Sequence, residues 1–189
     1  MTVPTDPAER HRVVAAAFTA RVRNASDWDA PAPVAGWRAR DVVAHLVEWF
    51  PDFLKTATGL TLDRGPSAEH DPVAAWQVHT DAVQRLLDGP QAGTAFRHPM
   101  VGQMPLPDAV DRFYTTDVFM HTWDLARATA QDERLDPQTC EDLLAQMVPI
   151  EDLMRSSGQY GARVTVPDDA DAQTRLLAFI GRDPLRGRQ

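Results

Sequence analysis

Three Asp-Pro dipeptides constrain the fold of this chain most strongly, because each one marks the start of a helix. Asp6-Pro7, Asp71-Pro72 and Asp136-Pro137 each offer a carboxylate that can cap the first backbone N–H groups of a helix. The proline that follows loses no hydrogen bond at the first helical position, because that position has no helical partner for an N–H. The chain is therefore expected to be built mainly from helices.

Apolar residues at helical spacing follow these Asp-Pro dipeptides and indicate how far each helix extends. The expected helices cover residues 7–25, 39–58, 72–87, 107–130 and 137–155, and a last helix ends at Gly181. FRHPMVGQMPL predicts a small hairpin arm, and ARVTV predicts a short strand at 162–166. The fold class is all-α, a helical bundle with a small hairpin arm and a short C-terminal extension. We expect the bundle to occupy residues 1–158 and the extension, residues 159–189, to pack on it.

Composition excludes several classes of function. The 189 residues carry a net charge of −8, so we expect no binding to nucleic acid, which requires a basic surface. The one cysteine, Cys140, excludes an internal disulfide and favours a reducing compartment. The N-terminus lacks the apolar core of a signal peptide, and no apolar run approaches the roughly 20 residues of a membrane-spanning helix. We therefore expect a cytoplasmic protein with no membrane partner.

A polar pair interrupts the apolar side of the helix expected at 107–130. Asp117 and His121, in the stretch DVFMHTWD, are four residues apart and therefore share a face with Val110 and Leu125. An isolated carboxylate on this apolar face would cost several kcal/mol or take up a proton. Something must compensate its charge.

His45 is a second polar intrusion, within VVAHLVEWF of the helix expected at 39–58. Neutral imidazole and ionised carboxylate are good ligands for a divalent cation, and ligands from facing helices form metal sites in bundles. We predict that His45, Asp117 and His121 hold one divalent metal and leave a coordination position open. An alternative stays open, in which Asp117 and His121 form a buried hydrogen-bonded pair that serves packing alone and His45 is a half-buried histidine bonded to a backbone carbonyl.

Neighbouring polar residues supply further candidates. Glu48 is a candidate general base, and Arg127 is a candidate for holding an anionic group. Asp124, three residues after His121, is expected to orient a metal ligand, or else to bond Arg127 or another helix. Trp49 is interpreted as a packing residue. The remaining histidines are interpreted as surface or packing groups: His11, His70, His79 and His98.

Three segments carry a resemblance to a known family: GWRARDVVAHLVEW, DVFMHTWDLARAT and VPDDADAQTRLLAFIGRDP. Together they resemble the DinB-like superfamily, and within it the N-terminal domain of mycothiol-dependent maleylpyruvate isomerases and related small metal-binding proteins. The resemblance implies a four-helix bundle that holds one divalent metal (zinc, or else nickel or iron). The ligand positions of the family fall on His45, Asp117 and His121. The isomerase has a glutamate where this chain has the shorter Asp117.

The resemblance also implies a function. It implies a metal-dependent enzyme that activates a small thiol, such as mycothiol, for transfer to or isomerisation of a small-molecule substrate. The isomerase carries a larger C-terminal domain and this chain a short tail, so maleylpyruvate isomerisation itself is not expected. Two alternatives stay open, a metal-activated hydrolase with Glu48 as base and a non-enzymatic ligand-binding or stress-response bundle. Related bundles often pair, so a homodimer is one expectation.

Overall fold

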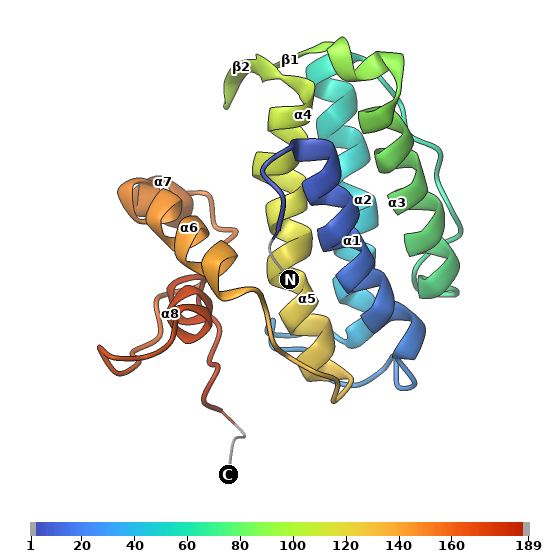
Figure 1. Ribbon diagram of the computed structural model, residues 1–189. Coiled ribbons are helices and arrows are strands. Elements are labelled where there is room, and N and C mark those ends of the chain that lie inside the picture. Colours follow the sequence, from blue (N-terminus) through green and yellow to red (C-terminus); the bar gives the residue numbers. More distant parts are fainter. Residues whose placement is uncertain (1–2, 187–189) are drawn as a thin grey trace. The chain divides into compact units, whose positions relative to one another are not determined.

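The computed structural model of the protein describes residues 3–186, and the contacts within it form two compact units (Figure 1). One unit is the segment Pro4–Asp132, and the other begins at Glu133. This division differs from the expected boundary between residues 158 and 159, because the helix that follows Glu133 packs against the last helix of the chain. The domain boundary itself stays a prediction.

Four helical stretches build the first unit. They are α1 (Pro7–Asn24), α2 (Ala39–Thr58), α3 (Pro72–Asp88), and α5 (Thr116–Ala128) with the short α4 (Leu106–Ala109) before it. The expected caps are present, since the Asp6 side chain accepts from the backbone N–H groups of Ala8 and Glu9. The Asp71 side chain caps α3 in the same way. None of the helices formed by residues 3–186 is long and apolar enough to cross a membrane.

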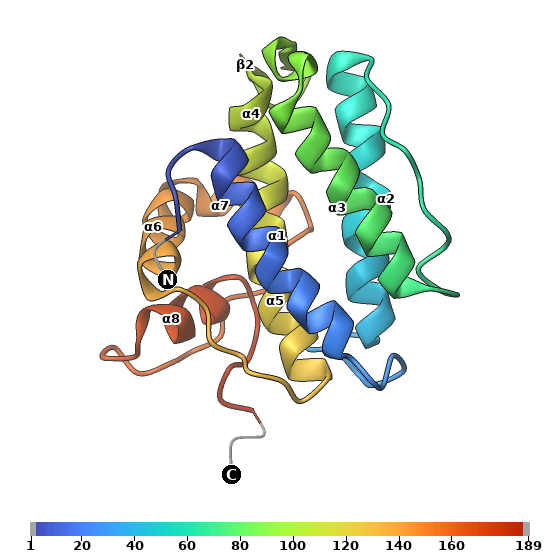
Figure 2. The same ribbon diagram turned by 45° about the vertical axis from the view of Figure 1, so that its right-hand side comes forward.

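The packing of these helices is that of a four-helix bundle. Helices α1 and α2 lie on opposite sides, and each packs between α3 and α5 (Figure 2). Phe18, Trp76 and Trp123 fill the core and are 0% exposed. The all-α fold class expected from the sequence is thereby confirmed. Because α2 and α5 are neighbours, a side chain on the inner face of one can meet side chains of the other.

A π-helical turn separates α4 from α5, where the sequence predicted one regular helix over 107–130. This turn spans Val110–Thr115, and at its end the backbone N–H of Thr116 donates to the carbonyl oxygen of Asp111, five residues earlier. Such wide turns are rare, occur mostly as single-turn insertions, and are frequent at functional sites. The turn ends at Thr115, two residues before Asp117 in α5.

The hairpin arm is present where the sequence predicted it. Strands β1 (Ala95–His98) and β2 (Gly102–Pro105) pair antiparallel, with His98 opposite Gly102. Gly102 has a φ of 86°, a left-handed conformation that glycine adopts without strain. The side chain of Phe96 is 0% exposed, and β1 packs against α2. The arm therefore extends the surface of α2 at one end of the bundle.

The second unit contains α6 (Pro137–Met147), a 3₁₀ turn (Val148–Ile150), α7 (Glu151–Ser156) and α8 (Ala172–Phe179). The predicted continuous helix over 137–155 is interrupted at Pro149, which lacks an N–H for the helical hydrogen bond. Helix α6 packs on α8. The predicted strand at 162–166 does not form within the described residues. Its Val164 N–H donates to the carbonyl oxygen of Ala178, so its neighbour is a helix and not a strand.

Candidate metal centre

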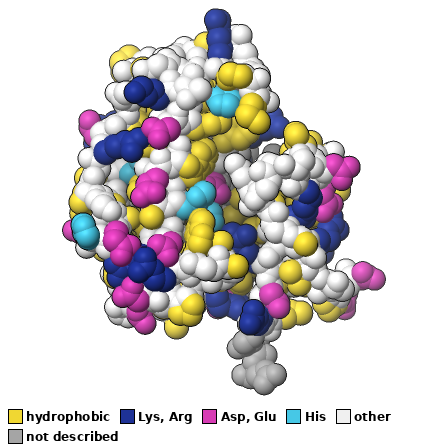
Figure 3. All heavy atoms as spheres, turned by 180° about the vertical axis from the view of Figure 1, so that it is seen from behind, with side chains coloured by type: hydrophobic (Ala, Val, Ile, Leu, Met, Phe, Trp, Pro, Cys, Tyr) yellow, Lys and Arg dark blue, Asp and Glu magenta, His cyan; other side chains and the backbone are white. Residues whose placement is uncertain are grey.

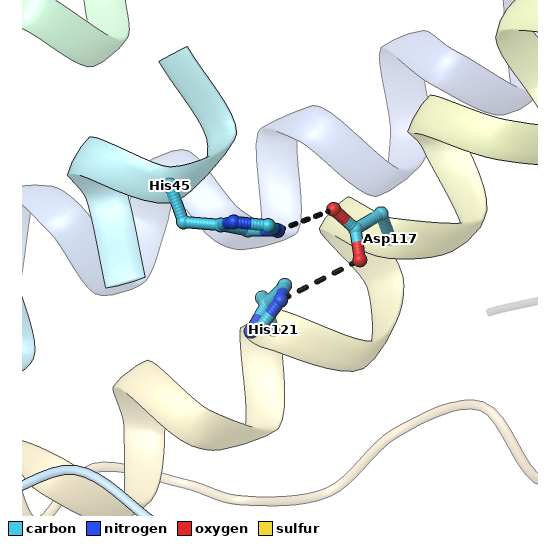
Figure 4. A group of neighbouring side chains, drawn as sticks. All are labelled: His45, Asp117 and His121. Atoms are coloured by element: carbon cyan, nitrogen blue, oxygen red, sulfur yellow. Dashed lines mark hydrogen bonds and ion pairs between the residues drawn. The ribbon is translucent and has the colours of Figure 1, made fainter. Parts of the chain in front are cut away.

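The structure brings together His45, Asp117 and His121, here called the triad, between α2 and α5 (Figure 4). One potential ligand atom of each residue lies within 4.8 Å of the corresponding atoms of the others. The Nε2 atom of His45 is 3.0 Å from Oδ2 of Asp117. The Nε2 atom of His121 is 3.5 Å from Oδ1 of the same carboxylate. The four-residue spacing on α5 and the neighbouring position of α2 together produce this cluster.

The triad reaches from the bundle interior to its surface. The exposed fraction of the side chain is 6% for His121, 18% for Asp117 and 32% for His45. In the space-filling view, histidine and acidic side chains come to the surface beside hydrophobic ones (Figure 3). A small molecule can therefore approach the triad from the side of His45.

The neighbours of Asp117 keep its carboxyl ionised. Burial alone would raise the pKa of this carboxyl, but the attraction of His121 and the hydrogen bond from His45 outweigh burial. The pKa of Asp117 is therefore lowered from its ordinary value. The indole Nε1–H of Trp49 also donates to Oδ2 of Asp117, at 3.0 Å. A fixed negative charge thus lies between two imidazole rings.

Asp124 determines which nitrogen of His121 faces the triad. Its Oδ2 lies 2.8 Å from Nδ1 of His121, and the Asp124 side chain is 0% exposed. A carboxylate oxygen accepts hydrogen bonds, so Nδ1 of His121 donates in this contact and Nε2 is the nitrogen that faces Asp117. Nε2 is then the atom of His121 that can bind a cation beside Asp117.

The donor set fits a divalent cation. Imidazole nitrogen and carboxylate oxygen are ordinary zinc ligands, and a histidine ligand commonly donates its other N–H to a carboxylate, as His121 does to Asp124. Ligand bonds of about 2.0–2.2 Å place ligand atoms roughly 3–4 Å apart, so small side-chain rotations would bring the triad into range. Within the part of the chain that the structure describes, this is the one such cluster of His, Cys, Asp and Glu.

The structure places the other candidate residues away from direct ligation. Glu48 is exposed on α2 and is not a member of the cluster. The guanidinium of Arg127 lies 4.7 Å from the centre of the Trp123 ring, in cation–π contact. The expectation that Asp124 would contact and orient His121 agrees with the geometry.

Two tryptophans beside the triad were not recognised from the sequence as site residues. The Trp37 ring stacks on His121, with ring centres 5.8 Å apart and planes 18° apart. Trp49 was interpreted as packing, yet it donates to Asp117. Its position four residues after His45 was an available signal, because that spacing places both on one face of α2. Trp37 lies in a loop, where periodicity gives no signal.

The remaining histidines divide between surface and core. His70 is exposed and His98 is half-buried. His11 and His79 are 0% and 2% exposed, and each of their rings contacts Tyr114. Burial is the main cause that lowers the pKa of His11 to about 4 and that of His79 to about 3. These two imidazoles are therefore neutral packing groups at neutral pH.

Comparison with known proteins identifies the family. Residues 9–126 match the model of the mycothiol maleylpyruvate isomerase N-terminal domain, so the chain belongs to that family and the resemblance is confirmed. The chain is also similar to two Mycobacterium tuberculosis proteins with the titles "Uncharacterized protein Rv0738" and "Uncharacterized protein MT0763". Each is 29% identical over 182 residues, which cover 94% of this chain and 98% of the relative. No solved structure gives a significant match.

Proposed function

We propose that this member of the mycothiol maleylpyruvate isomerase N-terminal domain family is a divalent-metal-dependent enzyme that activates a small thiol for transfer to, or isomerisation of, a small-molecule substrate. The observation that carries the proposal is that Nε2 of His45 and Nε2 of His121 lie beside the two carboxylate oxygens of Asp117. Zinc is the cation that this donor set favours, and nickel and iron are also compatible with it.

His45, Asp117 and His121 would hold the cation. A cation bound there would supply a Lewis acid that lowers the pKa of a thiol in the remaining position, which makes the sulfur nucleophilic at neutral pH. Three protein ligands leave such a position, as is usual for catalytic zinc. The half-buried side chain of His45 places it toward solvent, where a thiol and its substrate can enter.

The surrounding side chains orient the ligands. Asp124 accepts from Nδ1 of His121 and keeps Nε2 available for coordination. Trp49 donates to Oδ2 of Asp117 and limits the rotation of that carboxylate. Trp37 covers one face of His121 and reduces the access of water to it. These contacts hold the donors in place before a ligand arrives.

The thiol reaction is favoured over hydrolysis by the position of Glu48. Hydrolysis at the same site would use a metal-bound water, and a general base within reach of that water would assist its attack. Glu48, the candidate for that role, is exposed on α2 and lies outside the cluster. Coordination favours the deprotonated form of water and of a thiol alike, but the thiol is the stronger acid before it binds, so more of it is nucleophilic at neutral pH.

Metal content is the first test of the proposal. The wild-type protein, the His121→Ala variant and the His70→Ala variant are purified without a metal-binding tag and measured by elemental mass spectrometry. We expect about one zinc per chain in the wild type and in His70→Ala, whose histidine is exposed in a loop, and a loss of zinc in His121→Ala. Absence of metal from the wild type after reconstitution with zinc, nickel and iron would refute the proposal.

The thiol part has its own test. Zinc-loaded and metal-free protein are mixed with mycothiol and, separately, with 2-mercaptoethanol, and the rate of reaction with N-ethylmaleimide is followed at pH 7. A rate increase with zinc-loaded wild type that disappears in His121→Ala supports thiol activation. Equal rates with and without metal contradict it.

A further inference from the structure

A row of aromatic side chains continues from the triad along one face of the bundle. We call it the aromatic strip. Every member is only partly buried. The strip consists of Trp37, Trp49, Phe53, His98 and Phe113.

The rings of the strip form a continuous surface. The Trp49 ring centre lies 6.2 Å from that of His45 and 5.5 Å from that of Phe53. Phe53 in turn lies 5.5 Å from Phe113 and 4.8 Å from His98 of the hairpin arm. Because His45, Trp49 and Phe53 follow one another at four-residue spacing on α2, the strip runs along that helix. It begins at the triad and ends at the hairpin.

The partial burial of these rings distinguishes them from the core. Phe50 and Tyr114 lie on the same helical stretches, stack with ring centres 4.2 Å apart, and are 1% and 0% exposed. The bundle therefore buries aromatic rings completely where it packs its helices together. The rings beside the triad keep part of their surface available for contact, directly beside the polar donors. An apolar surface with a few convergent polar groups is the usual composition of a small-molecule site.

The two tryptophans of the strip are held in place before any ligand binds. The Nε1–H of Trp49 is fixed by its hydrogen bond to Asp117. Trp37 is fixed by its stacking on His121, and its loop is closed by the bridge between Pro31 and Arg38. Rings that are already ordered lose little conformational entropy on binding, which favours affinity.

We propose that the aromatic strip binds the aromatic ring of a small substrate whose polar head lies at the triad. Aromatic rings prefer partners that stack offset or edge to face, at centre distances of about 4.5–7 Å, and the strip offers several such partners in sequence. The inference rests on the proposed function, because the triad has to hold the polar head. It adds the substrate class: a molecule that carries an aromatic ring, in preference to an aliphatic one.

The test uses a series of zinc-binding probes. All of them carry the same hydroxamate head, and the group attached to it increases in size from methyl to phenyl to naphthyl. Acetohydroxamic, benzohydroxamic and 2-naphthohydroxamic acids are titrated into zinc-loaded protein, with calorimetry and tryptophan fluorescence as readouts. We expect the dissociation constant to fall at least tenfold from the first probe to the last. We expect the Phe53→Leu variant, which keeps apolar volume but removes the ring, to lose most of this gain, and Phe53→Tyr to retain it. Val73→Ala, which alters an exposed apolar residue on α3, is the matched control and should behave as wild type.

The outcomes separate this inference from the proposed function. Zinc at about one per chain, together with equal affinity for the three probes, would overturn the aromatic strip as a binding surface and leave the metal proposal standing. If the protein binds no zinc, the metal-free protein is titrated with 2-naphthamide and with acetamide, which lack a chelating head. Tighter binding of 2-naphthamide that Phe53→Leu weakens and Val73→Ala does not would support the strip alone. Equal binding of the two amides would refute it.

Discussion

His121 and Asp124 are joined by a hydrogen bond of 2.8 Å between Nδ1 and Oδ2, one helical turn apart and both buried. This contact sets the tautomer of a residue that faces the ionised Asp117. We predict that Asp124→Asn weakens zinc binding by about 10–100-fold. A neutral amide on Nδ1 makes Nε2 of His121 a weaker metal ligand than a carboxylate does. Competition against a chelator with a zinc-sensitive dye measures the change. An unchanged dissociation constant would show that Asp124 has a purely structural role.

Asp117 gives a second prediction, because the isomerase has a glutamate at the position where this chain has the shorter aspartate. Asp117→Glu keeps a carboxylate and adds one methylene, whereas Asp117→Asn keeps the length and removes the charge. If the carboxylate is a metal ligand, Asp117→Glu should retain about one zinc per chain and Asp117→Asn should lose most of it. Elemental analysis of both variants, after equal exposure to zinc, makes the comparison. Similar zinc content in the two variants would exclude ligation by this side chain.

Much of the fold follows from local signals in the sequence. The aspartate caps and following prolines determine where α1, α3 and α6 begin, and all three starts occur at the predicted residues. The triad was also predictable, because a polar residue on an apolar helical face requires a nearby partner. The four-residue spacing on α5 predicted that Asp117 and His121 share a face. In the structure, the His121 side chain and that of His45 from α2 both lie beside the Asp117 carboxylate.

Other features depend on tertiary contacts that the sequence pattern does not contain. The π-helical turn at Val110–Thr115 was not predicted, because Val110, Phe113 and Tyr114 also fit the apolar spacing of a regular helix. Trp37 stacks on His121 only because its loop folds back before α2, and no periodicity exists in such a loop. The segment at 162–166 has the alternation of a strand, but α8 is its neighbour and offers no strand edge. Helical spacing thus predicted the donors of the site but not the aromatic rings around it.

Cys140 gives a further prediction, and its test also shows whether the thiol of this residue would react in the thiol assays. Burial raises the pKa of its thiol to about 12, and the charges of Asp136 and Asp171 act in the same direction. The nucleophilic thiolate is therefore scarce at neutral pH, and the side chain is 0% exposed. We predict that Ellman's reagent labels no cysteine in the folded protein and about one per chain in concentrated urea, since Cys140 is the single cysteine. Rapid labelling of the folded protein would contradict the buried position.

The buried histidines His11 and His79 give a prediction for the dependence of stability on pH. Their folded pKa values, about 4 and about 3, lie below the value of 6.5 expected for an unfolded chain. Between pH 6.5 and 4 the unfolded state therefore binds more protons, so the free energy of unfolding falls as the pH falls. The full contribution to stability is present above pH 6.5.

One variant isolates this effect. His79→Leu removes one buried imidazole. Between pH 7 and pH 5 its free energy of unfolding should therefore fall by about 2 kcal/mol less than that of the wild type, at 1.36 kcal/mol per pKa unit. Urea denaturation in the presence of a chelator measures it without a contribution from metal. His70→Ala, which changes an exposed histidine, should show the same loss as the wild type. If His79→Leu also matches the wild type, His79 is protonated in the folded protein, and the assignment of a neutral core imidazole is wrong.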